Sequence, residues 1–348
     1  MLVESPPEPS AAQAAATRPR HGARAAGLLA ASGVLALVVV ASIAVGAKQM
    51  PLHEVWHGLF HYSGTASDVV VRDLRIPRTL LGVLVGLGLG LSGAVMQALT
   101  RNPLAEPGIL GVNAGAAAAV VSAISFFGAA SLSEFVWWAF LGAAVVSVVV
   151  YVLGGSRSAT PVRLALAGTA ATAALVGYIN AVQLMDSKAL DKLRFWTVGS
   201  LASANMDTVR QVAPFLVAGA VIALCLGRPL NAMALGDDTA RALGAHLTRT
   251  RIGAMAAITL LCGAATAACG PIVFVGLMIP HLVRFLTGPD MRWVLAYSAV
   301  LSPVLLLGAD VIGRVVTRPA ELQVGIVTAL IGGPVFIHLV RRKRMAQL

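Results

Sequence analysis

The chain has 348 residues, of which 57% are hydrophobic and 12% are charged, and its mean hydropathy is +0.82. This apolar excess is far above that of a soluble globular domain, so the composition indicates an integral membrane protein. The formal net charge is +11. Nucleic-acid binding is not needed to explain that charge if the basic residues follow the topology of a membrane protein.

The first 25 residues are rich in Pro, Ala and Ser and have no apolar periodicity. They are predicted to be a disordered cytoplasmic tail. A cleaved signal peptide is the alternative, since Val45-Gly46-Ala47 resembles a cleavage site, but the apolar run before it is longer than the usual apolar region of a signal peptide. The last residues, 343–348, are predicted to be a second cytoplasmic tail.

Apolar stretches long enough to cross a bilayer follow one another along the rest of the chain. The shortest of them contains Pro280 and His281 and is expected to be tilted, kinked or only partly crossing. The sequence therefore predicts an all-α polytopic membrane protein with ten transmembrane helices in one permease domain, 26–342. An even number places both termini on the same side. The predicted spans are 26–47, 79–99, 108–130, 134–154, 163–185, 211–227, 252–270, 272–286, 293–313 and 324–340.

The distribution of charge tests this topology independently. With both termini in the cytoplasm, the cytoplasmic segments hold sixteen basic and six acidic residues, whereas the outer segments hold ten basic and nine acidic residues. Lys and Arg are retained on the cytoplasmic side during insertion. The charge distribution thus favours cytoplasmic termini in the cytoplasmic (inner) membrane.

One polar segment, 228–251, separates two apolar runs on the cytoplasmic side. Gly236-Asp237-Asp238 is predicted to start a short helix and Gly244 to end it, with Leu235, Ala240 and Leu243 near one face. An amphipathic element of this kind is suited to docking a partner protein. A solvated connector between two spans is the alternative interpretation.

The chain lacks the motifs of common enzymes. No G-x-x-x-x-G-K-[ST] loop, H-E-x-x-H or G-x-S-x-G motif is present, and the seven histidines are scattered. Cys225, Cys262 and Cys269 all fall inside predicted spans and form no C-x-x-C pair, so neither a disulfide framework nor a metal site is indicated. We predict a protein that is not an enzyme and has no metal or cofactor of its own.

An ion-coupled secondary transporter would place ionisable groups at mid-membrane depth. Asp310 and His281 are such candidates, and Gln97, Asn113, Asn180 and Gln183 are polar but uncharged. The polar residues are more typical of hydrogen bonds between helices, and Asp310 is four residues from Arg314, as in an ion pair within one helix. Ion coupling is therefore the less favoured alternative to a pore that takes its energy from another subunit.

Several blocks in one order resemble the FecCD family, the membrane permeases of binding-protein-dependent ABC importers for ferric siderophores, haem and cobalamin. The resemblance covers nearly the whole chain after residue 25. The matching blocks are RIPRTLLG at 75–82, SGAVMQALTRNPLAEPGILGVNAGA at 92–116, TPVRLALAG at 160–168, LRFWTVGSL at 193–201, RPLNAMALGDDTARALG at 228–244, GPIVFVGLMIPHLVR at 270–284 and AELQVGIVTALIGGPVFIHLVRR at 320–342.

This resemblance implies the BtuC-like fold of type II ABC importer permeases and a set of partners. These are a second permease, identical or paralogous, two ABC ATPase subunits that bind ATP and Mg²⁺, and an extracytoplasmic substrate-binding protein. The implied cargo is a ferric siderophore, with haem or cobalamin as alternatives. The segment 228–251 would form the coupling helices that contact the ATPase, through Leu235, Gly236, Asp237, Asp238, Ala240, Arg241, Leu243 and Gly244.

The resemblance also implies two further sites. Asn102 and Leu104, in a loop with two prolines, would narrow the cytoplasmic end of the pathway; the alternative is a tight turn that only orients two helices. Arg75, Arg78 and Arg314 would bind acidic residues of the substrate-binding protein. Arg72 and Arg318 lie nearby, and interfacial anchoring is an equal explanation for them.

Overall fold

The structure is a computed structural model that describes residues 21–129, 132–155 and 161–341. These residues form helices joined by turns and loops, as expected for an all-α protein. The predicted C-terminal tail, 343–348, lies outside the described residues. Of the predicted N-terminal tail, 1–25, residues 1–20 also lie outside them, and residues 21–25 form the first turn of a helix. The ten helices that correspond to the predicted spans are α2 (His21–Ala44), α5 (Ile76–Thr100), α6 (Val112–Phe127), α7 (Leu132–Leu153), α8 (Pro161–Met185), α10 (Met206–Cys225), α13 (Leu247–Cys269), α14 (Val275–Thr287), α15 (Met291–Val316) and α16 (Val324–Arg341).

Seven of these helices are long and apolar enough to cross a bilayer, within the described part of the chain. The other three, α6, α14 and α16, are shorter apolar helices. The expectation of a tilted, kinked or only partly crossing helix around Pro280 stays a prediction; α14 has only 13 residues, and Pro280 lies inside it. An α-helix rises 1.5 Å per residue, so α14 extends for roughly 20 Å, less than the hydrocarbon core of a bilayer.

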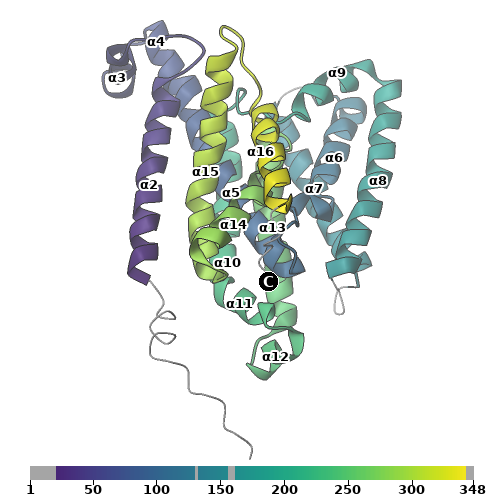
Figure 1. Ribbon diagram of the computed structural model, residues 1–348. Coiled ribbons are helices and arrows are strands. Elements are labelled where there is room, and N and C mark those ends of the chain that lie inside the picture. The colour runs from purple at the N-terminus through teal and green to yellow at the C-terminus, as the bar shows by residue number, and fades with distance from the viewer. Residues whose placement is uncertain (1–20, 130–131, 156–160, 342–348) are drawn as a thin grey trace, which may run out of the picture.

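Further helices lie at the two ends of the bundle (Figure 1). At one end, which we call the α12 end, are α11 (Gly227–Ala234) and α12 (Asp237–Ala242). At the opposite end, the α9 end, are α3 (Leu52–Phe60), α4 (Ala66–Val69) and α9 (Ser187–Trp196). A π-helical segment, Val70–Arg75, joins α4 to α5, so that the helix is continuous from Ala66 to Thr100. The helices at the α9 end are absent from the sequence-based prediction.

The centre of the bundle is formed by α5, α13 and α15, whereas α2 and α8 lie at its periphery (Figure 1). The glycines of α5 allow this packing. A Cβ at Gly93 would lie 1.9 Å from the carbonyl oxygen of Gly276 at the start of α14, and one at Gly86 would lie 2.6 Å from the Cα of Pro303 in α15. Because only a residue without a Cβ permits such approach, the Gly82 to Gly93 run serves helix packing.

The chain between α5 and α6 is not a simple surface turn. After Arg101, whose φ is +49°, it includes a short 3-10 helix, Pro107–Leu110, and reaches α6 only at Val112. Asn113 accepts a hydrogen bond from Thr266 near the far end of α13, at 2.9 Å, so this non-helical segment penetrates the bundle. Irregular backbone at membrane depth is tolerated where protein surrounds it or where it lines a cavity.

Candidate functional site

The predicted coupling segment forms two short helices that project from the α12 end (Figure 1). As predicted, a helix begins at Asp237 and ends just before Gly244. Gly236 and Gly244 have φ of +100° and +80°, a backbone conformation that favours glycine, and a Cβ at either would meet open space. These glycines are therefore required by the turns and not by neighbouring side chains. The end of the predicted segment, 247–251, belongs to α13.

The apolar face of this element differs from the prediction. Leu235 and Leu243 are 61% and 64% exposed, as a docking face requires, but Ala240 is fully buried. Ala240 lies on the inner side of α12, where its N–H bonds to the carbonyl of Gly236 and its carbonyl accepts from Ala245. The prediction that Ala240 shares the exposed face is wrong. Leu235 and Leu243, one at each end of α12, are the large apolar side chains that remain exposed on this element.

The charged residues of α12 have two different environments. Asp238 is fully exposed at its side chain and pairs with Arg241 at 2.8 Å within the helix. Asp237 instead accepts hydrogen bonds from Arg101, just after α5, and from Arg251 of α13, the latter at 2.6 Å. Burial raises the pKa of the Asp237 carboxyl, but the hydrogen bonds and charges of the two arginines outweigh it and lower that pKa below its ordinary value. Asp237 therefore joins the projecting helix to two parts of the bundle.

A second connection joins α11 to α15. The Asn231 side chain donates to Asp290, at 2.8 Å, and accepts from the backbone N–H of Met291, also at 2.8 Å. Asp290 also caps the start of α15, and its hydrogen bonds from Arg292, together with that from Asn231, lower its pKa to about 2. The two connections attach α11 and α12 to α15, α13 and the end of α5, so a force on the projecting helices would reach three elements of the bundle.

Replacing Asp237 by Asn is expected to loosen this attachment. The variant keeps the shape but removes the charge that two arginines share, and for groups that are partly exposed the expected loss is about 1 kcal/mol per pair. We expect a melting temperature lowered by a few degrees and transport reduced about threefold, measured on the purified complex. The control is Asp207→Asn, which removes the charge of an exposed pair with Arg210 and should leave both unchanged; equal effects of the two substitutions would contradict the role of Asp237.

The pH dependence of the Asp237 contact follows from its lowered pKa. A carboxyl whose pKa is lower in the folded state contributes stability that is fully present above the unfolded pKa and is lost as the pH falls through the folded pKa. The difference in stability between the parent protein and Asp237→Asn should therefore be constant from roughly pH 6 to pH 8. A melting series across that range checks it.

The two predicted gate residues lie in the turn that follows Arg101. The Asn102 side chain accepts a hydrogen bond from the backbone N–H of Leu104 at 2.9 Å, and the Asn102 N–H bonds to the carbonyl of Gln97. Asn102 thus holds the turn in which Leu104 sits, beside the Arg101 contact to Asp237. The structure brings the predicted gate turn and the predicted coupling helix together, and the role of Asn102 and Leu104 as a gate stays a prediction.

Two of the polar residues within the predicted spans bond across helices, as expected. Gln97 of α5 donates to the carbonyls of Gly276 and Leu277, at 3.3 and 3.0 Å, and accepts from Arg284 of α14. Asn113 pairs with Thr266. Gln97 therefore satisfies the carbonyl of Gly276, because its usual partner four residues on would be a backbone N–H, which Pro280 lacks.

At the α9 end, the structure brings Arg75, Arg78 and Arg314 together but directs them inward. They are 4%, 8% and 1% exposed. Arg78 binds Asp310 through two nitrogens, at 2.7 and 3.0 Å, and Glu321 at 2.6 Å. Arg314 reaches Asp310 at 2.9 Å, so the expected pair within one helix is present, although it is buried and not near the surface.

The remaining guanidinium contacts of this cluster hold the end of α2. Arg75 donates to the carbonyls of Ile43, Ala44 and Lys48, at 2.7 to 2.8 Å. Arg314 donates to those of Ser42 and Val45, and Arg318 to that of Gly46, at 2.9 to 3.0 Å. The last carbonyls of a helix lack partners within it, and a cation is favourable there. Three arginines thus cap α2.

These contacts require a correction of the docking prediction. A guanidinium that binds carboxylates of another protein must be accessible, and the three predicted residues are enclosed and paired with groups of this chain. Arg318 donates to the carbonyl of Gly46, just after α2, and the interfacial explanation for Arg318 stays a prediction. Arg72 is exposed, but it donates to the carbonyls of Gly58 and Leu59 in α3, at 2.9 and 3.0 Å. Structural demands within this chain therefore account for the excess of arginine at this end.

Comparison with known proteins identifies the family of this chain. Residues 34–342 match the FecCD transport family. The chain belongs to the FecCD family. It is a multi-pass membrane permease subunit of an ABC importer and is not an enzyme. It is all-α and has the fold of metal-chelate ABC transporters. A solved metal-chelate type ABC transporter in an inward-facing conformation matches it with a TM-score of 0.78 and 29% sequence identity. The match covers 90% of this chain and 98% of that one.

Relatives within the FecCD family are similar over nearly their whole length. The chain is 48% identical to the ferric enterobactin transport system permease protein FepD of Escherichia coli, covering 90% of this chain and 96% of FepD. It is 38% identical to the probable siderophore transport system permease protein YfiZ of Bacillus subtilis, covering 89% and 93%. The hemin transport system permease protein HmuU of Yersinia pestis is 34% identical, covering 89% and 94%.

Proposed function

We propose that this chain is the pore-forming permease subunit through which a ferric siderophore crosses the cytoplasmic membrane. Ten membrane helices, including the shorter α6, α14 and α16, place both termini and the α12 end in the cytoplasm and the α9 end outside. The observation that carries this topology is that the projecting helices α11 and α12, with Leu235 and Leu243 exposed, lie opposite α3, α4 and α9. The excess of basic residues on the α12 side supports it.

The energy source is ATP hydrolysis on separate subunits. A pair of ATPase subunits, which bind ATP and Mg²⁺, contacts the exposed leucines of the coupling helices, and Asp238 and Arg241 lie at the rim of that contact. The connections through Asp237 and Asn231 carry the resulting displacement to the turn of Asn102 and Leu104, which narrows the pathway, and to α15. A second permease, identical or paralogous, completes the pathway.

An extracytoplasmic binding protein delivers the cargo to the α9 end. In this proposal Arg75, Arg78 and Arg314 lie beneath the docking surface and stabilise it, and the exposed groups above them make the contact. Among the residues that the structure describes, no cluster of His, Cys, Asp or Glu is suited to hold a metal ion. Iron would therefore travel within its chelate and not as an ion bound by this chain.

The identity of the cargo is the part that most needs a test. Siderophore is favoured because the chain is 48% identical to a ferric enterobactin permease and 34% identical to a hemin permease. The importer, reconstituted in liposomes with its ATPase and binding protein, should take up ⁵⁵Fe-siderophore only when ATP is present. Excess unlabelled siderophore should compete, while haem and cobalamin should not. Competition by haem alone would instead make the chain a haem permease.

A further inference from the structure

Helix α3, at the α9 end, carries exposed apolar side chains that neither the coupling helices nor the arginine cluster explains. Leu52, Trp56 and Phe60 are 74%, 62% and 61% exposed. They lie four residues apart, so they form one stripe along the helix. His53 and His57 lie one residue further on and form a neighbouring polar stripe, which is also exposed. α3 therefore presents an apolar face and a polar face to its surroundings, side by side.

The direction of the apolar stripe is fixed, because the opposite side of α3 is packed against the chain that leads into α5. Gly58 is buried, and a Cβ added there would lie 3.1 Å from the Cβ of Val71. Arg72 donates to the carbonyl of Gly58 at 2.9 Å, and Glu54 accepts a hydrogen bond from the Ser67 hydroxyl at 2.6 Å. These contacts hold α3 in a rotation that leaves its apolar stripe outside the bundle.

α3 lies at the margin of the bundle, beside the end of α2 that the arginine cluster caps (Figure 1). Only residues 45–51 separate the two helices. Along α2, Leu29, Leu37 and Val40 are 63% to 75% exposed. Such side chains face lipid when they belong to a peripheral helix that crosses the membrane. The apolar stripe of α3 therefore lies at the outer edge of a lipid-facing surface.

The composition and size of the stripe favour lipid over a partner protein. Helices that lie in the membrane interface carry Trp, Phe and Leu on the face that enters the membrane. Trp56 and Phe60 form a pair of this kind, with ring centres 4.4 Å apart. Three side chains offer less area than the roughly 800 Å² per partner that a stable protein interface buries. The stripe also has no charged residue with which an acidic partner could pair.

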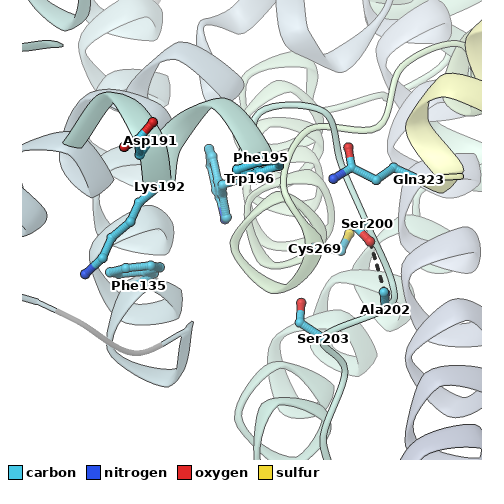
Figure 2. A pocket seen from close by; sticks show the side chains of 10 residues that line it. All are labelled: Phe135, Asp191, Lys192, Phe195, Trp196, Ser200, Ala202, Ser203, Cys269 and Gln323. Atoms are coloured by element: carbon cyan, nitrogen blue, oxygen red, sulfur yellow. Dashed lines mark hydrogen bonds between the residues drawn. The ribbon is translucent and has the colours of Figure 1, made fainter. Parts of the chain in front are cut away.

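An equally exposed phenylalanine at the same end has different surroundings. Phe195 of α9 is 59% exposed, and it lines a pocket together with Asp191, Lys192 and Ser200 (Figure 2). Charged and polar side chains of this kind are typical of a surface in contact with water. Phe195 therefore serves as the reference for an exposed ring that does not enter the membrane.

From these observations we propose that α3 lies in the outer membrane interface, with Leu52, Trp56 and Phe60 inserted between the lipid headgroups and the histidine stripe directed to water. The apolar face of such a helix enters the boundary between headgroups and acyl chains by roughly 5 to 10 Å. Because Arg72 joins α3 to the π-helical segment, the lipid contact holds the start of the continuous α4–α5 helix at a fixed depth. The inference goes beyond the proposed function and holds for any cargo.

The test measures the accessibility of spin labels on the whole importer in nanodiscs of phosphatidylethanolamine and phosphatidylglycerol. Cys225, which is exposed, is replaced by Ser, and one label is then attached through Trp56→Cys, Phe60→Cys, His53→Cys or Phe195→Cys. Oxygen concentrates in lipid, whereas a nickel chelate stays in water. The ratio of collisions with oxygen to collisions with the nickel chelate should be about tenfold higher at positions 56 and 60 than at positions 53 and 195.

His53→Cys is the matched control, since it lies on the same helix as the stripe and differs only in the face that carries the label. A ratio at positions 56 and 60 no higher than at position 53 would overturn the inference. Adding the substrate-binding protein should change neither ratio. If the nickel chelate reaches the labels at 56 and 60, and only the binding protein shields them from it, the stripe is a surface for docking protein and the inference fails.

Discussion

Leu243→Asp should abolish most transport while the permease remains folded and inserted. Leu243 is 64% exposed, so the substitution removes no contact that holds this chain together. In the complex, the leucine is expected to fill an apolar groove of the ATPase, which is worth about 1.5 to 3 kcal/mol, and an aspartate there adds a cost of desolvation. Since 1.4 kcal/mol is a factor of ten, we expect at least a tenfold loss of ATPase co-purification and of uptake.

Two variants make this experiment decisive. Leu243→Met keeps an apolar side chain of similar size and should retain most of the transport. Gly236→Trp places a large side chain at a position where φ is +100°, and it should uncouple transport by distorting the turn before α12. Normal uptake by Leu243→Asp, with the ATPase still bound, would refute the assignment of α12 as a coupling helix.

Asp310→Asn should cause the largest loss of stability. Asp310 is completely buried and its carboxylate binds both Arg78 and Arg314. Breaking a buried ion pair by neutralising one partner leaves the other charge buried and uncompensated, which costs about 3 to 5 kcal/mol. We expect a melting temperature lowered by about ten degrees and a reduced yield of monodisperse protein in detergent.

The control for this prediction is Asp207→Asn. Asp207 pairs with Arg210 at 3.5 Å, but both side chains are about three-quarters exposed, so its removal should change the melting temperature little. The double variant Arg78→Gln, Asp310→Asn should be less damaged than the sum of the two single variants, because each single substitution already breaks the same pair. Additive effects would show that the Arg78 contact contributes nothing.

Much of the fold could be predicted because its signals are local. The apolar stretches located ten helices, and the glycines around 236 and 244 located α12, since a positive φ favours glycine wherever it occurs. The helices at the α9 end were not predicted, because the signals that fix them are not local. α9 has four charged residues among its ten and is fixed by contacts that are distant in sequence, such as the one between Lys192 and Phe135.

The candidate sites were less predictable, because burial depends on tertiary packing. Nothing around Ala240 distinguishes an exposed alanine from one that faces the bundle. From the sequence, an arginine outside the membrane is a candidate for docking. Only the structure shows that Arg75 and Arg314 instead bond to carbonyls at the end of α2. For Arg314 the sequence did contain a signal, because Asp310 lies four residues before it and such a spacing indicates an ion pair within the helix.

The backbone contacts of α5 have a consequence for how the pathway can open. Gly93 touches Gly276, and Gly86 touches Pro303, with no side chain between the backbones. Surfaces that meet in this way have no flexible groups to absorb a sliding motion, so α5, α14 and α15 should move as one rigid block. The hinge of the transport cycle is then to be sought outside this block, for example at α2, which is joined to it through the side chains of Arg75, Tyr297 and Arg314.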